Sequence, residues 1–369
     1  NDIKVDLHND QTAYVALDNH KYGDYSPYLY KTSNGGKSWK SITNGIPDGT
    51  LIWRLVQDHV NPNLLFLATE YGVYVSLNQG DNWHKFSTGL PTISVRDLAI
   101  QKRENDLVLA TFGRSFYILD DYSPLRELTE ESLEADALLF PVRTALQYNE
   151  VIGSSRSQGG SFYVAKNPEY GAMFTMHIKD GHTSLKATRK KEEGKLKTEN
   201  IPFPGWDALD AEQNEAKAEA ILVVRDSDGM IVDQISTVLR SGIQRVNWDL
   251  KRPYINTADA NSRWGLYARR LDVGPGTYTV SLHKRVGGTL TDLAGPVSFE
   301  VKRIRENVLE NPIADQRDDY INQLMALNME VDLANHNFNK SSKHLQTLIK
   351  ALPYLNKNQS ELTATLYGL

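Results

Sequence analysis

Short runs in which apolar and polar residues alternate, separated by turn residues, fill the first third of the chain. Two pairs of strands are expected there, at residues 12–18 with 28–32 and at residues 64–70 with 72–76. Residues 106–121 repeat the strand–turn–strand pattern before the chain reaches Ser123 and Pro124. Because no helical periodicity interrupts these strands, they indicate consecutive antiparallel sheets.

A polar box follows each of the first two strand pairs, reading T-x-N-x-G-x-S-W and S-x-N-x-G-x-N-W. In a short hairpin, Asn tolerates left-handed backbone, Gly avoids a clash and the hydroxyls bond the turn backbone. The Trp is expected to bury its ring beneath the hairpin, and sugar stacking is the functional alternative. Equivalent positions lie 44 residues apart: Thr32, Asn34, Gly36, Ser38 and Trp39 in the first box, and Ser76, Asn78, Gly80, Asn82 and Trp83 in the second.

This box resembles the Asp-box (BNR) repeat, S/T-x-D-x-G-x-x-W, with Asn in place of Asp in both copies. The repeat lies on the outer edge of β-propeller blades in sialidases, xyloglucanase-type glycoside hydrolases and sortilin (VPS10) proteins. The resemblance therefore implies a propeller fold and no particular chemistry. Closed propellers use roughly four to eight blades, whereas residues 1–125 make two blades and part of a third. We expect an upstream polypeptide, from the same precursor or a separate chain, to supply the rest. A small incomplete β-domain is the alternative.

Residues 126–305 are expected to form an Ig-like β-sandwich that resembles the FlgD-type domain. Period-two alternation marks residues 219–235 and 274–286, and Asp228-Gly229 is a hairpin turn signal. Trp248 is expected in the core. Residues 181–219 interrupt this pattern with a charged, aperiodic stretch, which predicts a long solvated loop or hairpin. Nucleic-acid binding is the alternative reading of that basic run.

Residues 306–369 are expected to form a helical tail. Asn311 and Pro312 are a suitable helix start, and a second helix is expected over residues 341–352, ending at Pro353. Together these predict a helical hairpin that packs on its own core or on a partner. The first helix carries an apolar stripe at three- and four-residue spacing: Ile321, Leu324, Leu327, Val331, Ala334 and Phe338.

Composition narrows the functional classes. The chain has 369 residues, 40% hydrophobic and 24% charged, with no Cys, which rules out disulfides, thiolate metal sites and a Cys nucleophile. No apolar stretch approaches 18 residues, so no membrane span is expected. The net charge of −5 gives no electrostatic case for nucleic acid. No cofactor or metal motif is recognised, and none is expected to bind.

Catalytic motifs are missing from the sequence: it has no Gly-rich phosphate loop, no HExxH and no GxSxG. Glycoside hydrolysis needs two carboxylates that face one sugar. Glu70 and Arg114 lie in matching turns of adjacent repeats, so both could line one rim. Asp120 and Asp121 follow a strand, but neighbours on a strand point to opposite faces. Turn caps and surface charges are the alternative. The carboxylates considered are Asp18, Asp24, Glu70, Asp97, Asp120 and Asp121.

The order of motifs resembles one group, the large extracytoplasmic proteins of Bacteroidetes-type bacteria that are sortilin-like or BNR-repeat propellers. Their last blade ends in a strand like residues 111–125, followed by strands like residues 167–172, 245–250 and 274–280 and a helical tail. This resemblance implies export to the periplasm or cell surface of a bacterium. The chain departs from the commoner Gly-His-Gly-Arg form at Phe112, which weakens an acid–base role for that turn.

Two functions remain open. The first is a non-enzymatic binding or scaffold module whose propeller rim binds protein, peptide or glycan. The second is a glycoside hydrolase whose catalytic carboxylates lie mostly in the missing upstream blades. The expected architecture is mainly β: terminal propeller blades, an Ig-like (FlgD-type) β-sandwich and a C-terminal helical hairpin.

Overall fold

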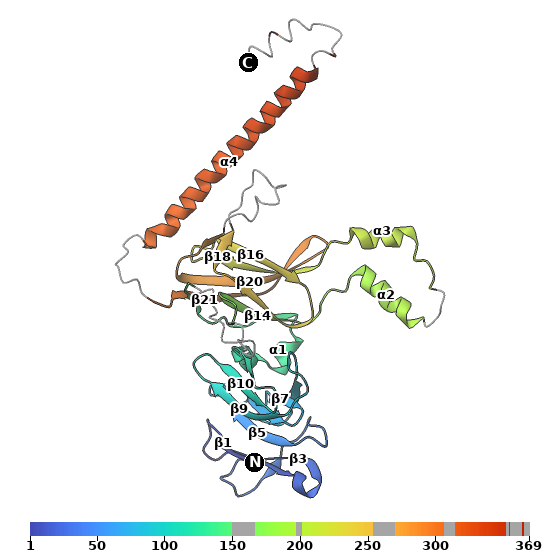
Figure 1. The fold of residues 1–369 in the computed structure, drawn as a ribbon, viewed down its shortest axis with the longest axis vertical. Coiled ribbons are helices and arrows are strands. Elements are labelled where there is room, and N and C mark those ends of the chain that lie inside the picture. The colour runs from blue at the N-terminus through green and yellow to red at the C-terminus, as the bar shows by residue number, and fades with distance from the viewer. Residues whose placement is uncertain are drawn as a thin grey trace, which may run out of the picture. The chain divides into compact units, whose positions relative to one another are not determined.

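The computed structural model describes residues 1–149, 167–196, 201–253, 270–305 and 314–351, together with residues 354 and 364. The chain is mainly β (Figure 1) and divides into two compact units. The first is built on residues 1–140 with residues 175–180. The second holds residues 141–165 and 169–174 and everything from residue 181 onward.

Three antiparallel sheets make up most of the first unit, and in each sheet the strands lie in chain order. The strand pairs expected from the sequence are confirmed in all three sheets. The first sheet contains β1 (Asp2–Val5), β2 (Ala13–Asn19), β3 (Asp24–Thr32) and β4 (Lys40–Ser41). The second contains β5 (Ile52–Gln57), β6 (Leu65–Thr69), β7 (Gly72–Ser76) and β8 (His84–Phe86). The third contains β9 (Val95–Gln101), β10 (Asp106–Thr111) and β11 (Phe116–Leu119).

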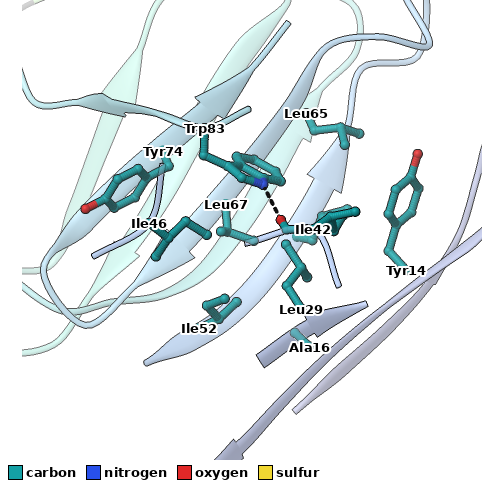
Figure 2. Packing of buried hydrophobic residues seen from close by; sticks show 11 residues of the cluster. Tyr14, Ala16, Leu29, Ile42, Ile46, Ile52, Leu65, Leu67, Tyr74 and Trp83 are labelled. Atoms are coloured by element: carbon teal, nitrogen blue, oxygen red, sulfur yellow. Dashed lines mark hydrogen bonds between the residues drawn. The ribbon is translucent and has the colours of Figure 1, made fainter. Parts of the chain in front are cut away.

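Short helical turns join these elements: η1 (His20–Tyr22) between β2 and β3, then η2 (Ser123–Glu127) and α1 (Glu130–Glu134) after β11. The second sheet is covered on both faces, and every residue of β6 and β7 is buried. One core lies between it and the first sheet, where Leu29, Leu67 and Trp83 pack together (Figure 2). The other core lies against the third sheet and contains Phe66 and Leu109.

The two polar boxes form the same hydrogen bonds, as their shared sequence predicts. Asn34 Oδ1 accepts from Thr32 Oγ1 and from Ser38 N, both at 3.0 Å, and Gly36 N donates to Thr32 Oγ1 at 3.0 Å. The second box repeats each bond at 2.8–3.0 Å among Ser76, Asn78, Gly80 and Asn82. The boxes are therefore self-contained turns that use their polar side chains internally.

The two box tryptophans differ, and the expectation that both rings are buried is wrong for the first. Trp83 is 2% exposed and its Nε1 donates to the Ile42 carbonyl of the first sheet at 2.8 Å (Figure 2). Trp39 is 45% exposed. The Trp83 ring lies beside Gly80 of its own box and also packs on Ile42, which follows the last strand of the preceding sheet. None of the described residues supplies a preceding sheet for Trp39.

Beyond the three sheets the chain forms a five-stranded sheet, a three-stranded sheet and a strand pair. The first has the order β13 (Ala145–Gln147), β21 (Thr289–Arg303), β20 (Gly276–Val286), β15 (Glu219–Arg225), β16 (Ile231–Val238). The second has the order β12 (Ala137–Leu139), β14 (Ala172–Ile178), β17 (Gly242–Trp248). The pair is β18 (Lys251–Pro253) and β19 (Arg270–Asp272).

Trp248 is 1% exposed, so its expected core position is confirmed. Its ring lies 5.5 Å from that of Tyr278 and 6.1 Å from that of Phe299, and Phe174 lies 5.5 Å from Phe299, all measured between centroids. These contacts join β14 and β17 to the five-stranded sheet through an aromatic core. The turn at Asp228-Gly229 links β15 to β16 as expected, with Gly229 at a φ of +77°.

The charged stretch 181–219 is helical in part, which corrects the expected loop. It contains α2 (Leu185–Lys195) and α3 (Trp206–Asn214). Ser184 Oγ caps α2 by accepting from Ala187 N at 3.2 Å. Arg189 bonds Glu193 one turn along at 2.6 Å and Glu212 of α3 at 2.5 and 2.9 Å. Ion pairs stabilise these two helices. Neither helix has an apolar stripe, which is the sequence pattern that would have predicted a helix there.

The expected helical hairpin is also wrong for the residues described. A single helix, α4 (Ala314–Ala351), runs for 38 residues through the point where the hairpin was expected to turn. No Gly or Pro lies between Phe338 and Ser341 to end it. The start at Asn311-Pro312 and most residues after 351 lie outside the described part. Among the described helices, none is long and apolar enough to cross a membrane.

Candidate functional site

A small cavity of about 250 Å³ opens at one edge of the first unit. Because successive strands alternate in direction, the β2–β3 and β6–β7 turns share this edge with the β4–β5 and β8–β9 connections. The rim pocket, as we call it, is lined by His20, Tyr25, Gly49, Leu51, Trp53, Glu70, Tyr71 and Arg96. Residues of all three sheets and of the turns between their strands therefore line the rim pocket.

Glu70 occupies the tight turn between β6 and β7. Its N–H donates to the Leu51 carbonyl at 3.0 Å, and the turn closes through Thr69 Oγ1, which donates to the Gly72 carbonyl at 2.9 Å. Glu70 Oε2 accepts from Trp53 Nε1 at 2.9 Å and from Ser94 Oγ at 3.0 Å. The carboxylate is therefore fixed by donors from two other segments.

Arg96 closes the pocket beside Glu70. Its guanidinium carbon lies 3.9 Å from the centre of the Trp53 ring and 5.5 Å from that of Phe112. Its NH2 lies 3.6 Å from Glu70 Oε2, and the side chain is 43% exposed. Stacking on aromatic faces holds the guanidinium plane in place while its edge stays accessible to solvent.

His20 also contacts the Trp53 ring, with the two ring centres 5.9 Å apart in an edge-on arrangement. Its Nδ1 is hydrogen-bonded to Asp18. Burial acts to raise the pKa of Asp18, but hydrogen bonds from His20 and Asn1 outweigh it, so this pKa lies below its ordinary value. Asp18 thus stays ionised and orients the imidazole.

Exposed aromatic faces complete the rim pocket. Tyr25, near the start of β3, is 54% exposed, and Tyr71, in the β6–β7 turn, is 48% exposed. An acceptor carboxylate, a guanidinium and flat apolar faces together suit a ligand that carries several hydroxyls on an apolar ring. The described residues contain no group of three or more His, Asp or Glu side chains that could hold a metal ion.

The structure does not bring the four candidate catalytic residues together. Glu70 lines the rim pocket, whereas Arg114 is exposed in the β10–β11 turn and does not line it. Asp120 and Asp121 follow β11 at its other end. Asp121 accepts from Ser123 N at 3.2 Å and from Ser123 Oγ at 2.6 Å, as a turn cap does.

Sequence reasoning missed Trp53, Ser94 and Arg96. Trp53 lies on β5 and Arg96 on β9, the first strands of consecutive sheets, 43 residues apart. This spacing nearly equals the repeat length of 44 seen in the boxes. Following the repeat along the first strands, as well as along the boxes, would have placed both residues near one rim.

A larger cavity of about 620 Å³ lies in the second unit, lined in part by Tyr148, Tyr170, Asp272 and Arg303. The Tyr148 and Tyr170 ring centres are 5.2 Å apart, and burial raises the pKa of Tyr170. Residues 150–166, 254–269 and 306–313 adjoin these lining residues in the sequence and lie outside the described part. We assign no site to this cavity.

No family model and no curated protein matches the chain. Solved structures match at low similarity. A GH74 xyloglucanase from Xanthomonas campestris is 14% identical, with a TM-score of 0.25 over 30% of this chain and 18% of that one. An ancestral GH74 enzyme is 13% identical, with a TM-score of 0.28 over 81% and 34%.

The extracellular domain of a one-component system from B. thetaiotaomicron is 13% identical, with a TM-score of 0.21 over 79% of this chain and 30% of that one. The chain therefore spans about a third or less of each of these structures. With TM-scores below 0.5, these similarities carry no argument about this chain's fold or activity.

Proposed function

We propose that the chain is a binding module of a larger extracytoplasmic, sortilin-like β-propeller protein, and that the rim pocket binds a glycan. In this proposal the three sheets are propeller blades and the second unit is an Ig-like supporting domain. The observation that carries the proposal is the meeting of Glu70, Arg96 and the exposed faces of Tyr25 and Tyr71 in one cavity. Sugars combine hydroxyls for the charged groups with an apolar face for the rings.

Binding is favoured over hydrolysis by the chemistry of the rim pocket. Glycoside hydrolysis needs two carboxyl groups, about 5–10 Å apart, on either side of the sugar. Glu70 is the single carboxylate among the lining residues described. It already accepts hydrogen bonds from Trp53 and Ser94, which suits a fixed acceptor better than an acid that exchanges protons.

The test is to titrate the intact chain with a panel of oligosaccharides by calorimetry. We expect Tyr71→Ala, which removes a pocket wall, to weaken binding by about tenfold, in line with the loss of one aromatic contact. Tyr22→Ala is the matched control, because Tyr22 is 87% exposed on η1 and does not line the cavity. Equal losses in both variants, or no binding of any glycan, would refute the proposal. Release of reducing ends that disappears in Glu70→Gln would favour the hydrolase instead.

The proposal also assigns a partner to the outer face of the first sheet. The residues Leu55, Leu67 and Tyr74 lie in register across the second sheet and are buried against the first. The row that corresponds to it in the first sheet is Ile3, Val15 and Tyr30, in the same register.

In the described part of the chain, this corresponding row is partly exposed. Ile3 is 72% exposed, and its neighbours on this face, Val5 and Leu17, are 63% and 46% exposed. Trp39 belongs to the same face by its equivalence to Trp83. We infer that an upstream propeller sheet packs there and offers Trp39 a backbone carbonyl, as Ile42 does for Trp83.

A further inference from the structure

The rim pocket has room for little more than one sugar ring. Its volume of about 250 Å³ lies below the range of roughly 300–1,000 Å³ that sites for drug-sized ligands have. A glycan of two or more units must therefore place its other sugars outside the pocket. The surface next to the pocket then decides whether those sugars add to the affinity.

The exposed ring of Phe112 lies next to the pocket wall that Arg96 forms. Phe112 does not line the cavity, and it is 72% exposed. The guanidinium carbon of Arg96 lies 3.9 Å from the centre of the Trp53 ring and 5.5 Å from the centre of the Phe112 ring. Arg96 therefore contacts one aromatic ring that lines the pocket and a second ring that does not.

Hydrogen bonds fix Phe112 relative to the pocket. Its N–H donates to the Ser94 carbonyl at 2.9 Å, and Ser94 Oγ donates to Glu70 Oε2 at 3.0 Å. The β10–β11 turn that carries Phe112 is closed by Thr111, whose N–H donates to the Ser115 carbonyl at 3.0 Å. Because Ser94 connects the Phe112 turn to the carboxylate of the pocket, a ligand that spans both would order little of the protein on binding.

Arg96 can donate to two sugars at once. Glu70 Oε2 lies 3.6 Å from its NH2, which is too far for a hydrogen bond, and Arg96 donates no hydrogen bond within the described part of the chain. A guanidinium carries five N–H donors in a rigid fork. Since stacking on Trp53 holds its plane, the accessible edge can bond a sugar in the pocket and an oxygen of the next sugar.

We propose that the rim pocket is one of two adjacent sugar subsites, and that Phe112 forms the second by stacking on the apolar face of the next sugar. The proposal rests on the glycan-binding function proposed above. It narrows the ligand to a glycan chain of at least two units, which crosses Arg96 between the two subsites.

The dependence of affinity on chain length tests the second subsite in the intact chain. The probes are unbranched oligosaccharides of glucose, xylose, mannose or galactose, each of one to six units, measured by calorimetry and, for single sugars, by ligand-observed NMR. In the series that binds best, we expect three units to bind about three- to tenfold more tightly than one, as one aromatic contact gives. Phe112→Ala should remove this gain and keep the affinity for one unit, which also shows that the variant is folded.

Phe116→Ala is the matched control for Phe112→Ala. Phe116 has the same side chain and is 67% exposed, and among the described residues its ring stacks on no cation or aromatic ring. Tyr22→Ala tests the other direction, because Tyr22 is 87% exposed and lies two residues from His20 of the pocket. Both variants should keep the full gain with length.

Tyr71→Ala separates this inference from the function on which it rests. Tyr71 lines the pocket, so its loss should weaken binding at every length. If Tyr71→Ala weakens binding but affinity does not rise with length, or rises equally in Phe112→Ala, the second subsite is refuted and glycan binding stands. A loss of the gain in Phe116→Ala or Tyr22→Ala as large as in Phe112→Ala would also overturn the inference. If no series binds at any length, the inference and the glycan-binding function both fail.

Discussion

At the residue scale, Asp58 is a fully buried ion in the first unit, held by several hydrogen-bond donors. It has no exposed surface, and it accepts from Arg126 at 2.8 and 2.9 Å, from Tyr122 Oη at 2.6 Å and from Asn61 N at 2.6 Å. Burial acts to raise the pKa of Asp58, but these donors outweigh it and lower the pKa to about 2. The contacts fasten the segment after β11 to the loop after β5.

Low pH should weaken these contacts of Asp58. Because the pKa of Asp58 is lower in the folded chain than its ordinary 3.8, its contribution is complete above about pH 4 and is lost as the pH falls toward 2. We expect Asp58→Asn to lower the free energy of unfolding at pH 7 by about 2–4 kcal/mol, since Arg126 would lose its buried counter-ion.

Urea unfolding at pH 7, 4 and 3 measures this effect. The loss of stability between pH 4 and pH 3 should be smaller in Asp58→Asn than in the wild type. Asp81→Asn serves as control, because Asp81 is 61% exposed and lies 3.7 Å from Lys40 in a surface pair. An unchanged pH dependence in Asp58→Asn would show that other groups control acid unfolding.

At the element scale, the two box hairpins form an internal comparison. The two hairpins share the hydrogen bonds within their turns. They differ in the residues that pack against the Trp ring. We expect Trp83→Phe to lower the free energy of unfolding by about 1–3 kcal/mol, because the buried Ile42 carbonyl loses its donor. Trp39→Phe should change it by less than about 0.5 kcal/mol. Thermal or urea unfolding of both variants checks this, and equal effects would mean that packing on the preceding sheet does not determine what each Trp contributes to stability.

Many of the strands and turns could be predicted from the sequence. The strands and boxes depend on period-two alternation and local turn chemistry, which residues such as Asn34 and Gly36 carry themselves. The helices α2 and α3 were missed because Arg189 pairs with Glu193 and Glu212 instead of packing an apolar stripe. For the rim pocket, Glu70 could be predicted as a candidate because it lies in the turn between two expected strands. Arg96 could have been placed near that rim by following the repeat along the first strands, whereas Ser94 could not, since only sheet packing brings the residue before β9 beside that turn.

At the scale of the whole molecule, the exposed face of the first sheet can be tested for its partner. If an upstream sheet packs there, Ile3→Glu should abolish association with the separately expressed upstream polypeptide while leaving this chain folded. Ile231→Glu, on β16 of the second unit and 49% exposed against 72% for Ile3, is the matched control. Pull-down of the two polypeptides measures the association.

The same association should bury Trp39. On binding the upstream polypeptide, the emission of the wild-type chain should shift to the blue and become less sensitive to acrylamide, and Trp39→Phe should remove that change. Trp83 cannot report it, because it is 2% exposed before any partner binds. If Trp39 remains as accessible in the joined protein as in the chain alone, the first sheet does not receive a neighbouring blade. Trp39 and Trp83 would then be equivalent in the hydrogen bonds of their turns but not in their packing on a neighbouring sheet.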